Sequence, residues 1–156
     1  MIQEGTMVIE GIVAQGKHLG RRLGFPTANV EPLCSAGAWP VNGVYACAIW
    51  IGRDPLAWPA MLNQGVHPTA PEGKPTIEAH IMGFEGDIYG KAVRVEYLRF
   101  LRPERRFESL DALVGQLRQD RRDVLDWLDG ARARSGASPE AARAAEIAWH
   151  RVNPDV

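Results

Sequence analysis

The residues best suited to chemistry are concentrated in one segment, 16–29, which reads GKHLGRRLGFPTAN. Gly16, Gly20 and Gly24 let the backbone approach a ligand closely. Three cationic side chains, Lys17, Arg21 and Arg22, stand among them. Backbone N–H groups combined with cations form a concave site for anions such as phosphate. The segment is therefore predicted to bind a phosphate group, and the alternative is a basic surface loop.

The end of this segment carries two oxygen-bearing side chains at a useful spacing. Pro26 restricts the backbone just before Thr27, and Asn29 follows two residues later. On extended backbone, residues two apart point to the same face. A hydroxyl and an amide oxygen are hard ligands that suit Mg²⁺, which commonly shares phosphate oxygens. Thr27 and Asn29 are thus candidate metal ligands, and the alternative is an ordinary turn.

A second phosphate-binding pattern, at residues 11–18, is rejected. It nearly matches G-x-x-x-x-G-K-[S/T], but His18 replaces the hydroxyl residue that binds magnesium in that motif. The residues that follow include Gly20, Gly24 and Pro26, which are unfavourable in the helix that the motif requires.

The elements around these residues are mostly strands. Apolar or alternating runs at 7–13, 43–51, 58–64, 76–83 and 92–101 are separated by turns and loops rich in Gly and Pro. A spacing of three and four between apolar residues then predicts an amphipathic helix over 110–128, with Ser109 as its N-cap. Strands followed by one helix favour an all-β-dominated fold, a small antiparallel barrel or sandwich.

Composition excludes several other classes. Eighteen basic and 19 acidic residues give a net charge of −1, which argues against sequence-independent binding of nucleic acid. The longest uninterrupted apolar run, 44–51, is far shorter than the roughly 20 residues of a membrane-spanning helix. Two cysteines are too few for a disulfide scaffold. We expect a cytoplasmic protein that binds neither membranes nor nucleic acid.

Six motifs in order resemble the riboflavin kinase family. After GRRLGFPTAN come GVYA at 43–46, NQG with PT at 63–69, TIEAHI at 76–81, F-x-G-D-x-Y-G at 84–90 and L-R-x-E-x-x-F at 101–107. One such motif would be weak evidence of a relationship, but six motifs in the same order are strong evidence. The resemblance implies a six-stranded antiparallel Greek-key barrel with a C-terminal helix.

The resemblance also implies roles. ATP would be the co-substrate and Mg²⁺, or another divalent cation, would be held by Thr27 and Asn29. The γ-phosphoryl group would pass to the 5′-hydroxyl of riboflavin, giving FMN and ADP, with Glu78 as the base. The nucleotide would be bound by Gly16, Gly20, Arg21, Arg22, Gly24, Pro26 and Thr27. The flavin would be bound by Arg102, Glu104 and Phe107.

Alternatives remain open at this point. The alternative for Glu78 is a solvated carboxylate on a polar strand face, and His80 beside it receives no role. The barrel could be a non-catalytic flavin-binding or regulatory module, or a kinase for another small alcohol.

The expected organisation is a barrel with its packing helix over 1–128, followed by a linker and short helical tail over 129–156. We expect this tail to be dispensable for folding, and the protein to be a monomer. Only six residues precede the first strand, so we expect either a monofunctional kinase, forming FMN without FAD, or a domain of a larger protein.

Overall fold

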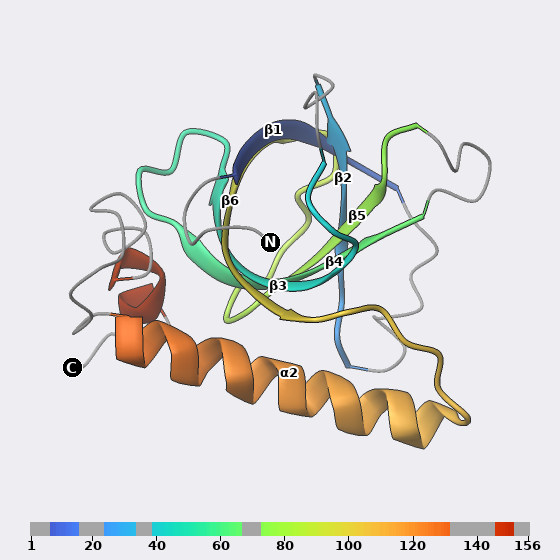
Figure 1. The fold of residues 1–156 in the computed structure, drawn as a ribbon. Helices are drawn as coiled ribbons and strands as arrows, with labels where there is room; N and C mark the ends of the chain where they lie inside the picture. The colour runs from blue at the N-terminus through green and yellow to red at the C-terminus, as the bar shows by residue number, and fades with distance from the viewer. Residues whose placement is uncertain (1–6, 16–23, 34–38, 67–72, 132–145, 152–156) are drawn as a thin grey trace.

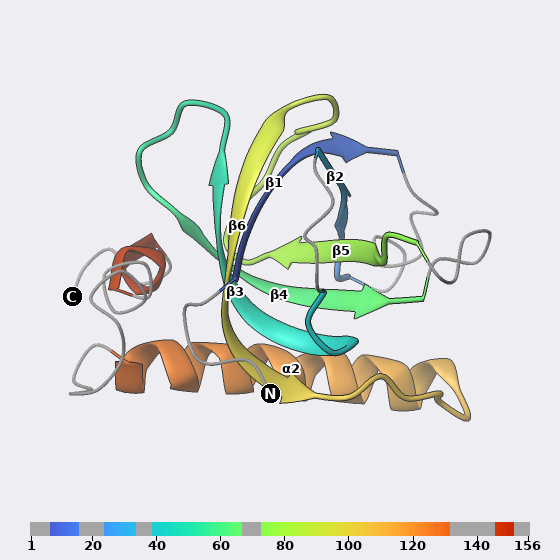
Figure 2. The same cartoon turned by 45° about the horizontal axis from the view of Figure 1, so that its top comes forward.

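The computed structural model describes residues 7–15, 24–33, 39–66, 73–131 and 146–151. Six strands close into a barrel in the order β1-β2-β5-β4-β3-β6, and each neighbouring pair is antiparallel. A long helix, α2, lies across the outside of the barrel (Figures 1 and 2). The bounds are β1 Met7–Ala14, β2 Ala28–Pro32, β3 Gly43–Ile51, β4 Trp58–Gly65, β5 Thr76–Ile81, β6 Ala92–Arg102 and α2 Leu110–Ala131.

The strand order is a Greek key, which confirms the expected fold class. Strands β3, β4 and β5 pair in succession, while β2 returns beside β5 and β6 lies beside β3. Sequence reasoning treated the residues after Pro26 only as extended backbone, whereas they form the short strand β2. Strand β5 stops at Ile81, two residues before the expected end, because Gly83 adopts a positive φ of 77° in the turn that follows.

Two apolar layers explain the burial pattern. Inside the barrel, Tyr45, Leu62 and Tyr97 belong to one cluster of buried side chains. Outside it, Ala46 and Leu98 belong to a second cluster together with residues of α2. Strand β3 has both faces covered, one by the barrel interior and one by the second cluster, so it reads as a nearly continuous apolar run.

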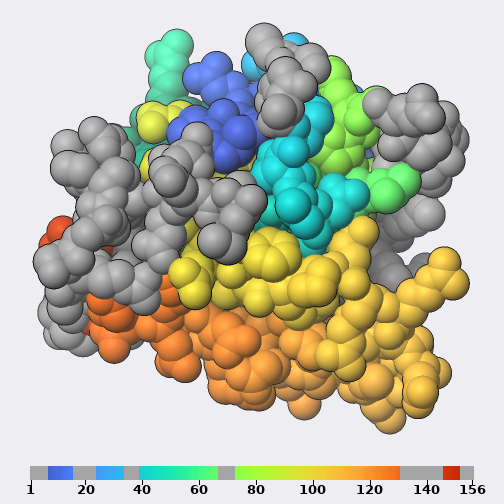
Figure 3. All heavy atoms as spheres, in the orientation of Figure 1, coloured from blue at the N-terminus to red at the C-terminus, as the bar shows by residue number. Residues whose placement is uncertain are grey.

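Helix α2 begins as expected and runs three residues beyond the expected end. The Ser109 hydroxyl accepts a hydrogen bond from the Ala112 backbone N–H at 3.1 Å, the geometry of an N-cap. The helix continues past Leu128 to Ala131, so it crosses the expected domain boundary. In Figure 3 it lies along one side of the molecule against the residues of β6.

A second helical stretch, 146–151, packs near the end of α2 (Figure 1). Its residues Ala148 and Trp149 are buried in the same outer cluster as Leu128 of α2. Arg151 forms an ion pair with Asp54, in the loop between β3 and β4, and lies 4.4 Å from the ring centre of Trp58. The expected helical character of the tail is therefore seen here. The linker was expected at 130–138, but residues 130 and 131 belong to α2, and the rest of the linker lies outside the described residues. None of the helices described could cross a membrane, being too short or too polar.

Candidate active site

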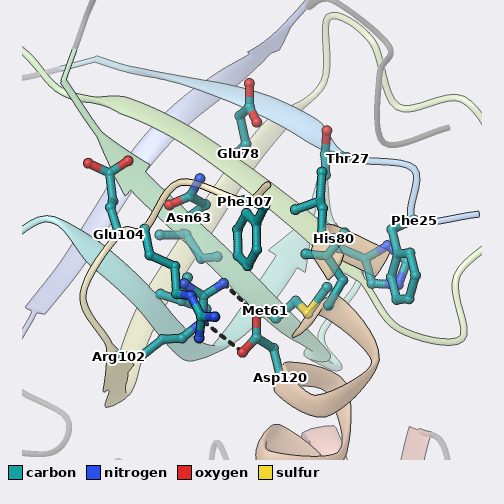
Figure 4. Close-up of a pocket in the computed structure, with 15 residues that line it drawn as sticks. Phe25, Thr27, Met61, Asn63, Glu78, His80, Arg102, Glu104, Phe107 and Asp120 are labelled. Atoms are coloured by element: carbon teal, nitrogen blue, oxygen red, sulfur yellow. Dashed lines mark hydrogen bonds and ion pairs between the residues drawn. The ribbon is translucent and has the colours of Figure 1, made fainter. Parts of the chain in front are cut away.

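A cavity of about 240 Å³ lies on the outer face of the barrel, where β4 and β5 are covered by residues 102–107 and by helix α2 (Figure 4). Its lining combines acidic, basic, aromatic and aliphatic side chains. They are Phe25, Thr27, Val44, Met61, Leu62, Asn63, Glu78, His80, Arg102, Glu104, Arg105, Phe107, Leu113, Leu117 and Asp120. We call this space the first cavity.

Glu78 enters the first cavity because of the alternation of β5. Ile77, Ala79 and Ile81 belong to the cluster inside the barrel, so Glu78 and His80 point outward. Sequence reasoning required this outward face to be covered by the loops at 16–27 and 65–75. The described cover includes Phe25 and Thr27 of the first loop, and in addition the segment after β6 and helix α2, which sequence reasoning did not place there. Residues 16–23 and 67–72 lie outside the described structure.

Three polar residues form a row across neighbouring strands. Glu78 of β5 pairs in register with Asn29 of β2 on one side and with Asn63 of β4 on the other. Directly opposed residues of antiparallel strands project to the same face and approach within about 5 Å at their Cβ atoms. The carboxylate of Glu78 therefore emerges between two amide side chains.

His80 ties the segment before β2 to strand β5. Its Nδ1 lies 2.8 Å from the carbonyl oxygen of Pro26. A carbonyl can only accept a hydrogen bond, so Nδ1 carries the proton and Nε2 is left as an acceptor. The ring also packs edge-on against Phe25 at 5.3 Å. Burial lowers the pKa of His80, which keeps the imidazole neutral at physiological pH.

A second cavity, of about 290 Å³, opens beside the first. It is formed by the end of β1, the start of β2 and the turn that follows β5, and Thr27 lines both cavities. Its lining residues are Val13, Ala14, Gln15, Pro26, Thr27, Ala28, Asn29, Ala79, Ile81, Phe84, Gly86, Asp87, Ile88 and Tyr89.

The second cavity presents several oxygen donors that suit a hard divalent cation. Among its lining residues, Thr27 carries a hydroxyl, Asn29 an amide oxygen and Asp87 a carboxylate. Asp87 also accepts a hydrogen bond from the Tyr89 backbone N–H at 2.9 Å, which shapes the turn. That turn is attached to β1, because Gly90 N–H donates to the Val13 carbonyl at 2.9 Å. The residues present therefore fit the Mg²⁺ expected from the sequence.

The three residues expected on the flavin side, Arg102, Glu104 and Phe107, all line the first cavity. Two guanidinium groups lie near the Phe107 ring, that of Arg105 at 5.1 Å and that of Arg102 at 5.8 Å from its centre. Glu104 lies against Gly65, where an added Cβ would come within 2.4 Å of its Oε1. Gly65 thus leaves the space that the Glu104 carboxylate occupies.

The residues expected on the nucleotide side are only partly visible. Gly16, Gly20, Arg21 and Arg22 lie outside the described residues. Gly24 adopts a positive φ of 84° and lines neither cavity, so its role in the structure is a backbone one. Pro26 and Thr27 line the second cavity.

Sequence reasoning missed several lining residues. The motif resemblance alone gives no role to Asn63 or to the turn at 84–90, because a motif does not show which side chains face a cavity. Sequence reasoning passed over Asp120, although a signal was present: Leu113, Leu117, Asp120 and Val124 follow one another at spacings of three and four, so an acidic residue interrupts the apolar stripe of α2.

Comparison with known proteins gives a consistent result. The sequence model of the family described as riboflavin kinase matches residues 4–128. A bifunctional riboflavin kinase/FMN adenylyltransferase of Pseudomonas fluorescens is 39% identical over 136 residues, which cover 86% of this chain and 40% of that protein. An RNA-binding riboflavin kinase of Bacillus subtilis is 38% identical over 114 residues, covering 72% of this chain and 47% of that one.

A solved structure supports the fold. The crystal structure of riboflavin kinase from Trypanosoma brucei superposes with a TM-score of 0.61 at 24% identity, covering 86% of this chain and 82% of that one. The chain thus spans less than half of the two bacterial relatives and most of the trypanosomal protein.

Proposed function

Because this chain belongs to the riboflavin kinase family, we propose that it transfers the γ-phosphoryl group of ATP to the 5′-hydroxyl of riboflavin. The products are FMN, ADP and one proton. The observation that supports this most directly is the position of Thr27, which lines both cavities, with Glu78 lining the first cavity and Asn29 the second. A group bound in one cavity can therefore reach a group bound in the other.

In this proposal riboflavin occupies the first cavity and ATP the second. Thr27 and Asn29 hold a divalent cation, which neutralises charge on the phosphate oxygens when it is bound. The carboxylate of Glu78 orients the 5′-hydroxyl and accepts its proton as the oxygen attacks the γ-phosphorus. The bond between the γ-phosphorus and the bridging oxygen breaks, and ADP leaves with that oxygen.

Other residues position these groups. His80, held neutral by burial, keeps the Phe25–Thr27 segment on β5 through its hydrogen bond to Pro26. The flavin ring system is bound by Phe107, Arg102 and Glu104. An aromatic ring with guanidinium groups near it suits a flat, polar ring system. Arg21 or Arg22 contributes a cation to the nucleotide phosphates.

Two alternative functions are separated by a single assay. A non-catalytic flavin-binding module has no need of a carboxylate base beside metal ligands, so the grouping of Thr27, Asn29 and Glu78 favours the kinase. The purified chain is incubated with riboflavin, ATP and MgCl₂, and the flavins are separated by chromatography. FMN formation supports the proposal. Riboflavin binding without FMN formation indicates the binding module. If riboflavin is neither bound nor phosphorylated, the kinase for another small alcohol is the alternative that stands.

We also propose that the protein works as a monomer in the cytoplasm and binds no nucleic acid. A net charge of −1 supports the last point, although one relative is named as RNA-binding. Light scattering of the eluted protein tests the monomer, and a gel-shift titration with RNA at physiological salt tests the absence of nucleic-acid binding.

A further inference from the structure

A buried ion pair joins helix α2 to the end of β6. Arg102 donates two parallel hydrogen bonds to Asp120, from Nε to Oδ1 at 2.9 Å and from Nη2 to Oδ2 at 2.8 Å. The Asp120 side chain is only 1% exposed and that of Arg102 is 17% exposed. Figure 4 shows the pair joined across the cavity wall, with Asp120 on α2. Both residues line the first cavity.

The two-point contact fixes the orientation of the guanidinium. A carboxylate that accepts from Nε and Nη2 holds the whole planar group, which a single contact cannot do. The remaining nitrogen, Nη1, donates to the Pro103 carbonyl at 3.1 Å. Arg102 is therefore held at all three nitrogens, and its position relative to the Phe107 ring is set from the helix side.

Gln116, one turn earlier on the same helix, extends this arrangement. Its Nε2 donates to Asp120 Oδ1 at 2.9 Å, and its Oε1 accepts from Arg105 Nη1 at 3.0 Å. Both guanidinium groups beside Phe107 are thus held by one edge of α2. Arg102 is the last residue of β6, whereas Arg105 belongs to the segment 103–109, which has neither helix nor strand structure. The conformation of that segment therefore depends on such contacts.

We propose that Asp120 is a positioning residue for riboflavin binding. It holds Arg102, and with Gln116 it keeps residues 102–107 in the conformation that forms the flavin side of the first cavity. Without it, riboflavin binding would have to order this segment, and that ordering costs affinity. This inference rests on the proposed function.

The test compares two aspartates of the same helix. Asp120→Asn keeps the shape of the side chain and removes the charge. Asp123→Asn is the matched control, since Asp123 is also bonded by a glutamine four residues earlier, Gln119 at 2.8 Å, but outside the cavity lining. Riboflavin affinity is measured by quenching of flavin fluorescence, and kcat and KM are measured for both substrates.

Asp120→Asn is expected to weaken riboflavin binding about tenfold or more, since it breaks a desolvated charge pair. At saturating riboflavin kcat should change less than about threefold, and KM for ATP should stay within about twofold. The Asp123→Asn variant should have the riboflavin affinity, kcat and KM values of the wild type. A merely structural ion pair would instead lower the amount of active protein without changing riboflavin affinity per folded molecule.

A double variant tests whether Asp120 acts on riboflavin binding through Arg102. If Asp120 acts through Arg102, then Asp120→Asn should have little further effect on riboflavin affinity in an Arg102→Gln background. Additive losses would overturn the inference. If Asp120→Asn fails to fold, Gln116→Ala takes its place with an expected loss of about threefold, and unchanged affinity there would overturn it.

The outcome separates this inference from the proposed function. A wild-type protein that forms FMN while Asp120→Asn retains wild-type riboflavin affinity refutes the role of Asp120 alone. A wild-type protein that neither binds riboflavin nor forms FMN refutes both.

Discussion

Asn29 and Glu78 lie directly opposite each other on strands β2 and β5, so their side chains emerge on the same face of the barrel. Glu78 lines the first cavity and Asn29 lines the second. The pairing of these two strands therefore places a candidate base and a candidate metal ligand on either side of the boundary between the cavities.

Replacing Glu78 by glutamine should lower kcat about 10²-fold or more and leave riboflavin affinity close to that of the wild type. The amide has nearly the same shape but cannot take up a proton at neutral pH. Steady-state kinetics and flavin fluorescence are measured side by side. The control is Glu31→Gln, an exposed position on β2 outside both cavities. A near-normal rate removes Glu78 from the mechanism, and an equal loss of rate and affinity makes it a binding residue.

Replacing Thr27 or Asn29 by alanine should raise the Mg²⁺ concentration needed for half-maximal activity, because each change removes an oxygen ligand. Thr27→Ser keeps the hydroxyl and should recover most of the metal affinity. Activity is titrated with MgCl₂ and thermal unfolding is recorded for each variant. If stability and activity fall in parallel with no change in metal dependence, these residues are structural.

His80 should make the free energy of unfolding depend on pH. Burial lowers its pKa in the folded protein below the ordinary 6.5, so the unfolded chain binds more protons in the interval between the two values. The stability that the neutral ring contributes is complete above about pH 6.5 and is lost as the pH falls through that interval.

The variant His80→Asn tests this dependence. Asparagine can still donate a hydrogen bond to the Pro26 carbonyl but does not titrate. Urea unfolding is measured from pH 8 to pH 5 for both proteins. The wild type should lose more stability than the variant below pH 6.5, and two parallel curves would show that His80 contributes nothing to the pH dependence.

The segment 146–151 should contribute to the stability of the barrel. Trp149 is buried in the same outer cluster as α2, and truncating a buried tryptophan to alanine commonly costs about 3–5 kcal/mol. We therefore expect Trp149→Ala to lower the free energy of unfolding by about 3 kcal/mol, measured by urea denaturation.

Truncation after Ala131 tests the organisation of the tail. The sequence favours a core that folds without it, and the packing of Trp149 predicts that this core is less stable than the full chain. The exposed Glu146→Gln change on the same segment is the control and should leave stability unchanged. If the truncated protein and the full chain have the same free energy of unfolding, the packing of Trp149 does not stabilise the barrel.

Local sequence patterns predicted an antiparallel β fold with one C-terminal helix, and the family resemblance then favoured a barrel over a sandwich. The alternation at 76–83 and 92–101 predicted strands, and the change to a spacing of three and four predicted α2 with Ser109 as its N-cap. These predictions succeed because backbone geometry relates residues only a few positions apart. The short strand β2 was not recognised, since five residues carry too little pattern.

For the site, the sequence determined which residue types were available and which shared a strand face. It placed Glu78 opposite the inward-facing Ile77 and Ala79, which the structure confirms. The order of six motifs was enough to indicate a kinase of riboflavin, and the family match agrees with it.

Only the tertiary structure decided what covers that outward face. The pairing of Asn29 with Glu78, the closure of residues 102–107 over the cavity and the ion pair between Arg102 and Asp120 all join segments far apart in the chain. A period-two pattern says that a side chain points away from the core, but not whether water or another segment meets it there. That depends on which apolar surfaces bury each other, here the outer wall of the barrel against helix α2.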